Sequence, residues 1–253
     1  MTEPPAGWIQ TTLGAICDHP QYGWTTSARR DALKTTALRF LRTTDITRGR
    51  LDWEAVPYCK DEPPRPEQYL LAPGDIVISR AGSIGFSYHL IDVEPAVFAS
   101  YLIRFRPSRL VDDRYVAYFL QSPRYWQQVR GAAAGIALAN INAKKLAAIE
   151  LPLAPRAEQE RIVAAIEEQF SRLDAGVAAL ERVIGPLTNT QGGRVTQLRS
   201  SILATAFSGK LVPRDPSDES ASTLFERIAD ERASSNGHKP ARVRSPRRKR
   251  ASA

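Results

Sequence analysis

A glycine-rich loop, Gly82–Gly85, is the first place where this sequence could bind a phosphate group. Loops that cradle phosphates combine glycines with a Lys-Ser/Thr pair, whose ammonium and hydroxyl groups reach the phosphate and its metal ion. No such pair follows this loop, and Gly209-Lys210 is followed by Leu211 and has no glycine five residues earlier. Neither stretch therefore has the pattern of a nucleotide-binding site.

Other catalytic patterns are absent from the sequence as well. A methyltransferase acting on amino groups needs an Asp/Asn-Pro-Pro-aromatic run, and the nearest stretch, residues 61–65, has the wrong order and no aromatic residue. No lysine has an acidic residue two positions before it, as a nuclease of the restriction type would need. The histidines and cysteines show no metal-ligand spacing; they are His19, His89, His238, Cys17 and Cys59. A Ser-His-Asp site stays open, although no nucleophile elbow is present. We therefore expect a chain that is not an enzyme by itself, with no metal or cofactor of its own.

The element most clearly marked in the sequence is a long helix over residues 157–184. Its apolar residues recur at steps of three and four, which gives a seam of heptad period. Proline precedes the helix and follows it, and acidic residues occupy its first turn, where the helix dipole favours them. The narrow seam favours a coiled-coil partner over an ordinary core-facing helix, which usually shows a wider stripe. Its members are Ile162, Ile166, Phe170, Leu173, Val177, Leu180, Ile184 and Leu187.

The sequence pattern of residues 1–154 predicts one α+β domain, because short apolar runs and helical stretches alternate there without the regular order of βαβ units. We predict strands over residues 38–43, 51–56, 76–78, 97–105 and 149–153, and helices over 113–121 and 124–130. Residues 155–212 form the helical region. Within it, Gly185–Gly193 should interrupt the helix, and Val195–Ala206 predicts a second helix too short to cover the seam. Residues 213–232 read as a linker and a short final helix.

The net charge of +8 comes from the end of the chain. Residues 232–253 contain eight basic and no acidic residues, which leaves 27 of each in the rest of the chain. Few apolar residues occur there, so residues 233–253 predict a disordered basic tail, either solubilising or bound non-specifically to DNA. No apolar run approaches the roughly 20 residues of a membrane span. The start of the chain does not resemble a signal peptide. These features favour a cytoplasmic protein with free thiols.

Several short stretches of the sequence, taken in their order along the chain, resemble the specificity subunit of type I restriction-modification systems. The most specific is the start of the long helix, where Glu158-Gln159 follows an Ile-x-Leu-Pro strand. Together the stretches span about residues 7–232: Gly7-Trp8, Leu13-Gly14, Arg42–Ile46, Gly74–Arg80 with Gly82, Asn140-Ile141, Ile149–Leu153, Pro155–Val163, Ala206–Val212 and Asp215-Pro216.

The resemblance implies that residues 1–154 are a target recognition domain that reads double-stranded DNA. Such a domain needs polar side chains that face a groove, and cations for the phosphates. Gln21 would pair with adenine, and Arg42 or Arg80 with guanine, while Tyr22 and Trp24 would pack on sugar or on a thymine methyl. The complete set of candidates is Gln21, Tyr22, Trp24, Thr25, Arg42, Thr43, Arg80, Ser83, Lys144 and Lys145.

The resemblance also implies partners. Methyltransferase subunits that carry S-adenosylmethionine would dock on the long helix. A nuclease and translocase subunit that uses ATP and Mg²⁺ could join them. With one recognition domain, the chain is about half a usual subunit, so we expect it to self-associate or to pair with a second half-subunit. The rival hypothesis is a coiled-coil scaffold that binds DNA only through its basic tail.

Overall fold

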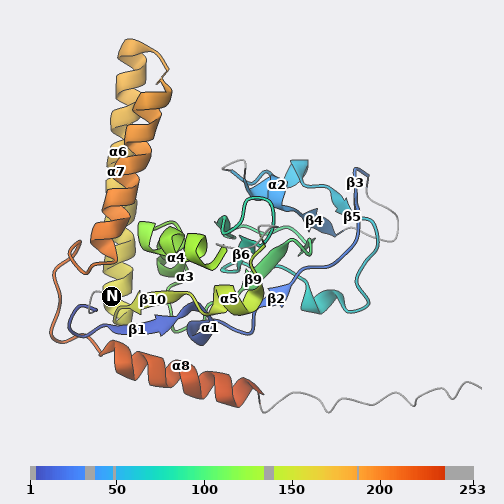
Figure 1. The fold of residues 1–253 in the computed structure, drawn as a ribbon, viewed down its shortest axis with the longest axis horizontal. Coiled ribbons are helices and arrows are strands. Elements are labelled where there is room, and N and C mark those ends of the chain that lie inside the picture. Colours follow the sequence, from blue (N-terminus) through green and yellow to red (C-terminus); the bar gives the residue numbers. More distant parts are fainter. Residues whose placement is uncertain (1–3, 32–37, 48–49, 134–139, 187, 237–253) are drawn as a thin grey trace, which may run out of the picture.

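The computed structural model describes residues 4–31, 38–47, 50–133, 140–186 and 188–236. Its strands and short helices form a mixed body, and a long helical hairpin projects from one end of this body (Figure 1). The predicted α+β class with a long helical region is confirmed. No helix in the described part is long and apolar enough to cross a bilayer.

A two-stranded sheet joins the two ends of the predicted recognition domain. Strand β1 (Ile9–Thr12) pairs antiparallel with β10 (Glu150–Leu153), in a register that places Ile9 opposite Leu153. Helix α1 (Leu13–Ile16) follows β1 without a loop, and the amide of Leu13 donates to the carbonyl of Ile149 at 2.8 Å. The chain therefore begins beside the strand that leads into the long helix.

The first four-stranded sheet has the order β2-β9-β6-β7 and is antiparallel throughout. Its strands are β2 (Gln21–Tyr22), β9 (Leu102–Phe105), β6 (Ile76–Ser79) and β7 (Ser87–His89). The turn before β6 is fixed by the buried carboxylate of Asp75, which accepts hydrogen bonds from Arg106 at 2.6 and 2.9 Å. Every residue of β6 is buried, as the run Ile76–Ile78 predicts.

The second four-stranded sheet has the order β3-β5-β4-β8. Its strands are β3 (Ala28–Arg29), β5 (Tyr58–Cys59), β4 (Arg39–Leu41) and β8 (Ala96–Phe98), and the β4–β8 pair is parallel. Between them lie helix α2 (Thr43–Ile46) and two 3₁₀ turns, η1 (Trp53–Ala55) and η2 (Pro66–Gln68).

Two strand predictions were wrong in this region. The predicted strand over 51–56 is the turn η1 instead, because the side chain of Asp52 accepts from the amide of Glu54 and caps it. The predicted strand over 97–105 is two strands, β8 and β9, which belong to different sheets. Residues 99–101 form the connection between them.

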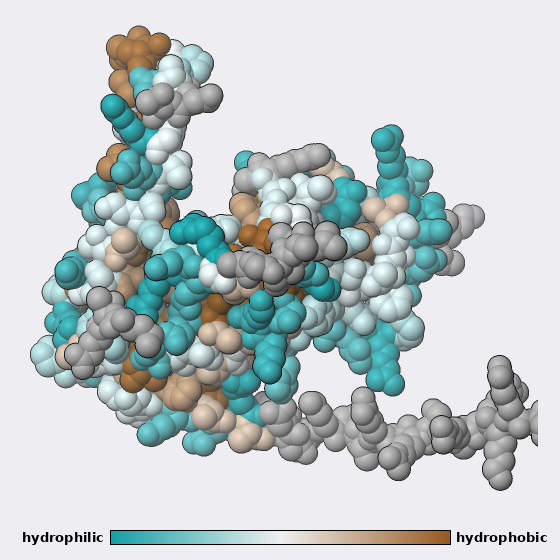
Figure 2. Space-filling model, viewed as in Figure 1, coloured by the Kyte–Doolittle hydropathy of each residue, from teal (hydrophilic) through white to brown (hydrophobic). Residues whose placement is uncertain are grey.

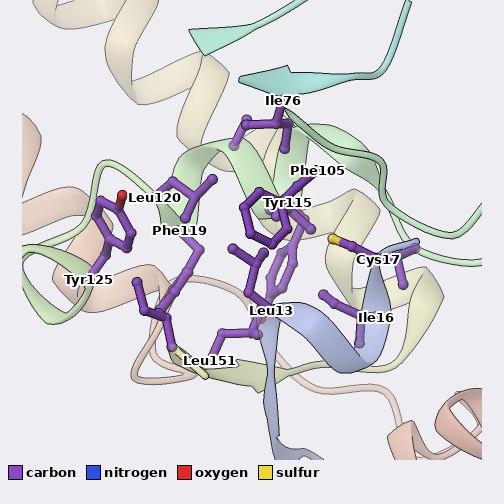
Figure 3. Close-up of a cluster of buried hydrophobic side chains, with 14 of the residues drawn as sticks. Leu13, Ile16, Cys17, Ile76, Phe105, Tyr115, Phe119, Leu120, Tyr125 and Leu151 are labelled. Atoms are coloured by element: carbon purple, nitrogen blue, oxygen red, sulfur yellow. The ribbon is translucent and has the colours of Figure 1, made fainter. Parts of the chain in front are cut away.

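Helices α3 (Asp113–Phe119) and α4 (Pro123–Ala133) confirm the two predicted helices, and α5 (Ala143–Ala147) precedes β10. With α1, β6, β9 and β10 they enclose the largest hydrophobic core, where the labelled side chains of Leu13, Phe105 and Tyr115 point toward one another (Figure 3). The hydroxyl of Tyr115 donates to the carbonyl of Pro152 at 2.7 Å, so the buried phenol is satisfied.

The helical hairpin consists of α6 (Arg156–Ile184) and α7 (Asn189–Ala206), which run side by side (Figure 1). The bounds of α6 agree with the predicted helix over 157–184 to within one residue at the start, so the prediction is confirmed. The predicted interruption over 185–193 was too long, because α7 continues through Gly192 and Gly193 after a capping box between Thr188 and Gln191. The prediction that α7 is too short to cover the seam was also wrong in part, since α7 has 18 residues and packs on α6.

Burial of the seam falls steadily from the base of the hairpin to its tip. Ile162 and Ile166 are buried within the large core, and Phe170 is 9 % exposed. Leu173 and Val177 are half-buried, whereas the exposed fractions of Leu180 and Ile184 are 44 % and 53 %. The last seam position, Leu187, lies outside the described residues.

A pair of buried polar side chains at the start of α6 fixes the hairpin to the body, and we call Glu158 and Gln159 the latch. The Oε2 atom of Glu158 accepts from the indole nitrogen of Trp8 at 2.9 Å. The side chain of Gln159 accepts from the amide of Asp112 at 3.0 Å and donates to the carbonyl of Ala154 at 2.8 Å. Thus the Glu-Gln pair singled out in the sequence is a structural joint.

Helix α8 (Ala221–Asn236) lies under the body and closes the core from below (Figure 1). The amide of Ala221 donates to the carbonyl of Gly7 at 3.1 Å, and Arg232 donates to the carbonyl of Ala15 at 2.6 Å. The predicted final helix is longer than expected, because it continues four residues into the predicted tail. Residues 237–253 lie outside the described part.

Candidate nucleic-acid interface

The connection between β8 and β9 lies where the two four-stranded sheets meet, and we call residues Ala99–Tyr101 the junction turn. The amide of Ala99 donates to the carbonyl of Leu41 at 2.9 Å, and the amide of Ser100 donates to the carbonyl of Trp24 at 3.0 Å. The carbonyl of Tyr101 accepts from the amide of Arg80 at 2.9 Å. Backbone hydrogen bonds therefore bring three stretches of candidate residues to one place: 21–25, 42–43 and 80–83.

The approach of the first stretch to the junction turn requires a glycine. A Cβ atom on Gly23 would lie 2.2 Å from the carbonyl oxygen of Ala99 and 2.4 Å from that of Phe98. Both atoms are backbone and cannot move aside like a flexible side chain. The residues that flank Gly23, Tyr22 and Trp24, are placed by this contact.

Arg80, Tyr22 and the start of α5 form the best-defined cluster of candidates. The Arg80 guanidinium lies over the Tyr22 ring, 5.0 Å from its centroid, in a cation–π arrangement. The hydroxyl of Tyr22 accepts from the amide of Ala143 at 2.9 Å, and Nε of Arg80 donates to Asn140 at 3.3 Å. Lys144 follows directly in α5 and is exposed. A ring, a guanidinium and an ammonium thus share one surface, which suits contacts to bases and phosphates.

Other candidates have partners inside the molecule. Arg42 donates to both carboxylate oxygens of Asp45, at 3.1 and 2.8 Å, so a contact to guanine would have to compete with this pair. Nζ of Lys145 donates to the carbonyl of Ala132 at 2.7 Å. The hydroxyl of Thr43 is buried, with no hydrogen-bond partner among the described residues. Arg42 and Lys145 are thus engaged within the chain, and the hydroxyl of Thr43 is closed off from solvent.

The remaining three candidates of the first stretch differ in exposure. The Gln21 amide donates to the carbonyl of Tyr22 at 2.9 Å. The indole nitrogen of Trp24 donates to the carbonyl of Asp61 at 2.9 Å, and the ring packs edge-on against Tyr69 with centroids 5.6 Å apart. Trp24 is thus chiefly a packing residue, while Thr25 beside it is exposed. Ser83 is exposed as well, in the Gly-rich loop that follows β6.

Sequence reasoning missed Tyr101, whose side chain is 62 % exposed on the junction turn. The apolar pattern predicts a single strand over 97–105 that would contain this residue. The available signal was Ser100, a polar residue that breaks the apolar alternation between Phe98 and Leu102.

Two further features through which the described residues could do chemistry are metal-ligand clusters and reactive thiols. No group of three or more His, Cys, Asp or Glu side chains in the described ranges could hold a metal ion. Both cysteines are buried and no disulfide joins them; the thiol of Cys59 donates to the carbonyl of Asp61 at 3.0 Å. Burial raises the pKa of Cys59 to about 11, so its thiol is protonated at neutral pH.

Comparison with known proteins assigns the family. The model of the type I restriction modification DNA specificity domain matches residues 5–180. The chain belongs to this specificity-subunit family. Within it, the chain is 24 % identical over 200 residues to the EcoKI specificity subunit of Escherichia coli K12, covering 78 % of this chain and 41 % of that protein. It is 26 % identical over 251 residues to the Escherichia coli EcoBI specificity subunit, covering 94 % of this chain and 51 % of that protein.

Solved structures share the fold. The HsdS subunit from Thermoanaerobacter tengcongensis superposes with a TM-score of 0.53 at 24 % identity, over 83 % of this chain and 47 % of that chain. A second solved chain comes from a study of complex assembly and conformational transition of the type I R-M system. It superposes with a TM-score of 0.55 at 23 % identity, over 83 % of this chain and 48 % of that chain. The chain therefore spans about half the length of the relatives named here.

Proposed function

We propose that this chain is the non-catalytic DNA-recognition subunit of a type I restriction-modification complex. It would direct adenine methylation, and restriction where a nuclease subunit is present, by partner subunits. S-adenosylmethionine, ATP and Mg²⁺ would then be bound by those partners. The observation that carries the proposal is the family match over residues 5–180, which includes every candidate DNA contact.

The geometry of the junction supports DNA reading in particular. Base recognition needs side chains held at fixed positions, because the donor and acceptor pattern of the groove is fixed. Arg80 and Tyr22 stand at strand ends that hydrogen bonds hold in place. The backbone amide of Arg80 donates to the carbonyl of Tyr101 in the junction turn, and the side-chain hydroxyl of Tyr22 accepts from the amide of Ala143 in α5. The rival scaffold hypothesis gives no reason for this arrangement.

Two copies of the chain, or this chain with a second half-subunit, would form the working unit. The tip of the hairpin exposes Leu180, Val183 and Ile184, with Val183 at 82 % (Figure 2). Apolar tips of this kind are covered in protein assemblies, and a twofold dimer is the most common solution. Two identical readers would recognise an inverted-symmetric, bipartite site.

The experiment is a methylation assay with labelled S-adenosylmethionine and genomic DNA as substrate. We expect no methyl transfer by the chain alone, and site-specific adenine methylation when a type I methyltransferase subunit is added. Methyl transfer by the isolated chain would contradict the non-catalytic assignment. Mapping of the methylated adenines then identifies the target sequence. A non-palindromic bipartite motif would show that the chain pairs with a different half-subunit.

A truncation separates this function from the scaffold hypothesis. We expect a chain that ends at Asn236 to retain its sequence preference and to lose only non-specific affinity, because the junction lies outside the basic segment. If the truncated chain binds no DNA, the basic segment is the reader and the scaffold hypothesis holds.

A further inference from the structure

Exposed aromatic rings are confined to one place on the described surface. Of the phenylalanine, tyrosine and tryptophan side chains that the structure describes, only Tyr22 and Tyr101 are exposed, at 37 % and 62 %. Both are joined to Arg80: Tyr22 through its ring, and Tyr101 through its backbone carbonyl. The two exposed aromatic residues therefore both adjoin Arg80, Tyr22 through a side-chain contact and Tyr101 through the backbone.

The backbone that presents Tyr101 is held on both sides of the boundary between the sheets. Within the junction turn, the amide of Leu102 donates to the carbonyl of Ala99 at 2.8 Å, which closes a tight turn. The hydrogen bonds to Leu41, Trp24 and Arg80 attach this turn to three other segments. An exposed ring on a fixed backbone has only two side-chain torsions left to order, so it can bind with a small loss of conformational entropy.

The neighbours of Tyr101 favour DNA over a protein as the ligand. Arg80 and Lys144 supply positive charge on this surface, while the carboxylate of Asp45, which follows β4, is neutralised by Arg42. In the major groove, the group that an apolar ring can recognise is the C5-methyl of thymine, which only A·T pairs present.

We propose that Tyr101 is a further specificity-determining residue, whose ring packs against a thymine methyl in the major groove next to the base or phosphate bound by Arg80. The inference rests on the proposed function. It adds a contact outside the stretches that carry the family resemblance, and it states which chemical group of the DNA is read.

The test begins with selection of binding sites by the full chain from a pool of random duplex DNA. Each thymine of the selected site is then replaced in turn by deoxyuridine, which lacks only the methyl group. For the wild-type chain we expect one replacement to weaken binding about fourfold, the value for one buried methyl group. Tyr101→Ala should bind the intact site about as weakly and show no further loss at that position. Tyr101→Phe should behave like the wild type.

Ile91→Ala provides the matched control, because Ile91 is an apolar side chain of similar exposure, 69 %, in the turn after β7. It should leave the deoxyuridine profile unchanged. If Tyr101→Ala keeps the wild-type profile, or the selected site contains no thymine, the inference is overturned while the proposed function stands. Loss of methylation with an unchanged DNA profile would assign Tyr101 to a protein partner and overturn it as well. If the wild-type chain selects no sequence, both the inference and the proposed function fail.

Discussion

The two ends of the helical hairpin use the same heptad seam in opposite ways. At the base, Ile162 and Ile166 are buried in a core shared with β10, α3 and α8. At the tip, Leu180 and Ile184 continue the same period but are exposed. Periodicity in the sequence therefore identifies a face of a helix, and only tertiary contacts decide whether that face is filled within the chain or left for another one.

Substitution at the base of the hairpin should have the largest effect on the free energy of unfolding. Ile166→Ala removes three carbons from a fully buried site and should lower the free energy of unfolding by about 2–5 kcal/mol. Val183→Ala, at the exposed tip, should change it by less than about 0.5 kcal/mol. Urea denaturation followed by circular dichroism measures both variants. Equal losses would show that the tip is packed as well as the base.

The latch should show the next largest effect. Gln159→Ala leaves the amide of Asp112 and the carbonyl of Ala154 without their partner in a buried site, at a cost of about 1–3 kcal/mol. Gln191→Ala, in the exposed capping box of α7, is the matched control and should cost about 1 kcal/mol or less. The same denaturation assay compares them. A smaller loss for Gln159 than for Gln191 would mean that the latch does not fix the hairpin.

A weaker tie joins β7 to α3 through His89 and Asp113, whose Nε2 and Oδ2 atoms are 2.8 Å apart. The hydrogen bond from His89 lowers the pKa of Asp113 below its ordinary value. Because the native state favours the ionised carboxylate, its contribution is present above about pH 4 and is lost as the pH falls through the native pKa. The Asp113 side chain is 39 % exposed, so solvent screens the pair and Asp113→Asn should cost about 0.2–1 kcal/mol at pH 7.

The measurement is the difference in unfolding free energy between wild type and Asp113→Asn from pH 5 to pH 3. We expect the difference to shrink below about pH 4. A difference that grows as the pH falls would reverse the assigned direction of the pKa shift.

The smallest effect on stability, but the largest on assembly, is expected at the tip. Leu180→Asp combined with Ile184→Asp should leave the unfolding midpoint nearly unchanged, because both side chains are already exposed. The same double variant should abolish self-association, since a charge without a partner in an apolar interface is costly. Sedimentation equilibrium detects the change in mass, and Thr196→Asp on α7 is the control. A variant that still self-associates would place the contact elsewhere.

Prediction from sequence succeeded where local chemistry determines the structure. The bounds of α6 follow from apolar periodicity with proline at each end, and β6 from a run of branched residues after a Pro-Gly-Asp turn. It failed where one side chain or a tertiary contact decides. The carboxylate of Asp52 turns residues 53–55 into a 3₁₀ turn, and α7 begins with the capping box of Thr188 and Gln191 and continues through Gly192 and Gly193.

The candidate DNA contacts stay predictions, which were made from the family resemblance together with residue type. The structure brings three of these candidates together, Tyr22, Arg80 and Lys144. Tyr101 was missed because its exposure depends on the chain passing from one sheet to the other at residues 99–101, which no local pattern encodes. Trp24 has the expected residue type for a DNA contact, but its indole is engaged with Asp61 and Tyr69.

The absence of a side chain at Gly23 has a consequence for how new DNA specificities could evolve. Tyr22, Thr25 and Tyr101 are exposed and belong to none of the hydrophobic core clusters of the described residues, so each can be exchanged without disturbing a core; exchange of Tyr22 gives up its hydrogen bond from Ala143 and its contact with Arg80. Gly23 lies between them at a spacing that admits no added carbon atom. The surface thus tolerates exchange at its exposed positions and does not tolerate it at Gly23. A library that randomises the three outward residues while keeping the glycine should yield folded chains with altered targets, whereas randomising Gly23 should yield few folded chains.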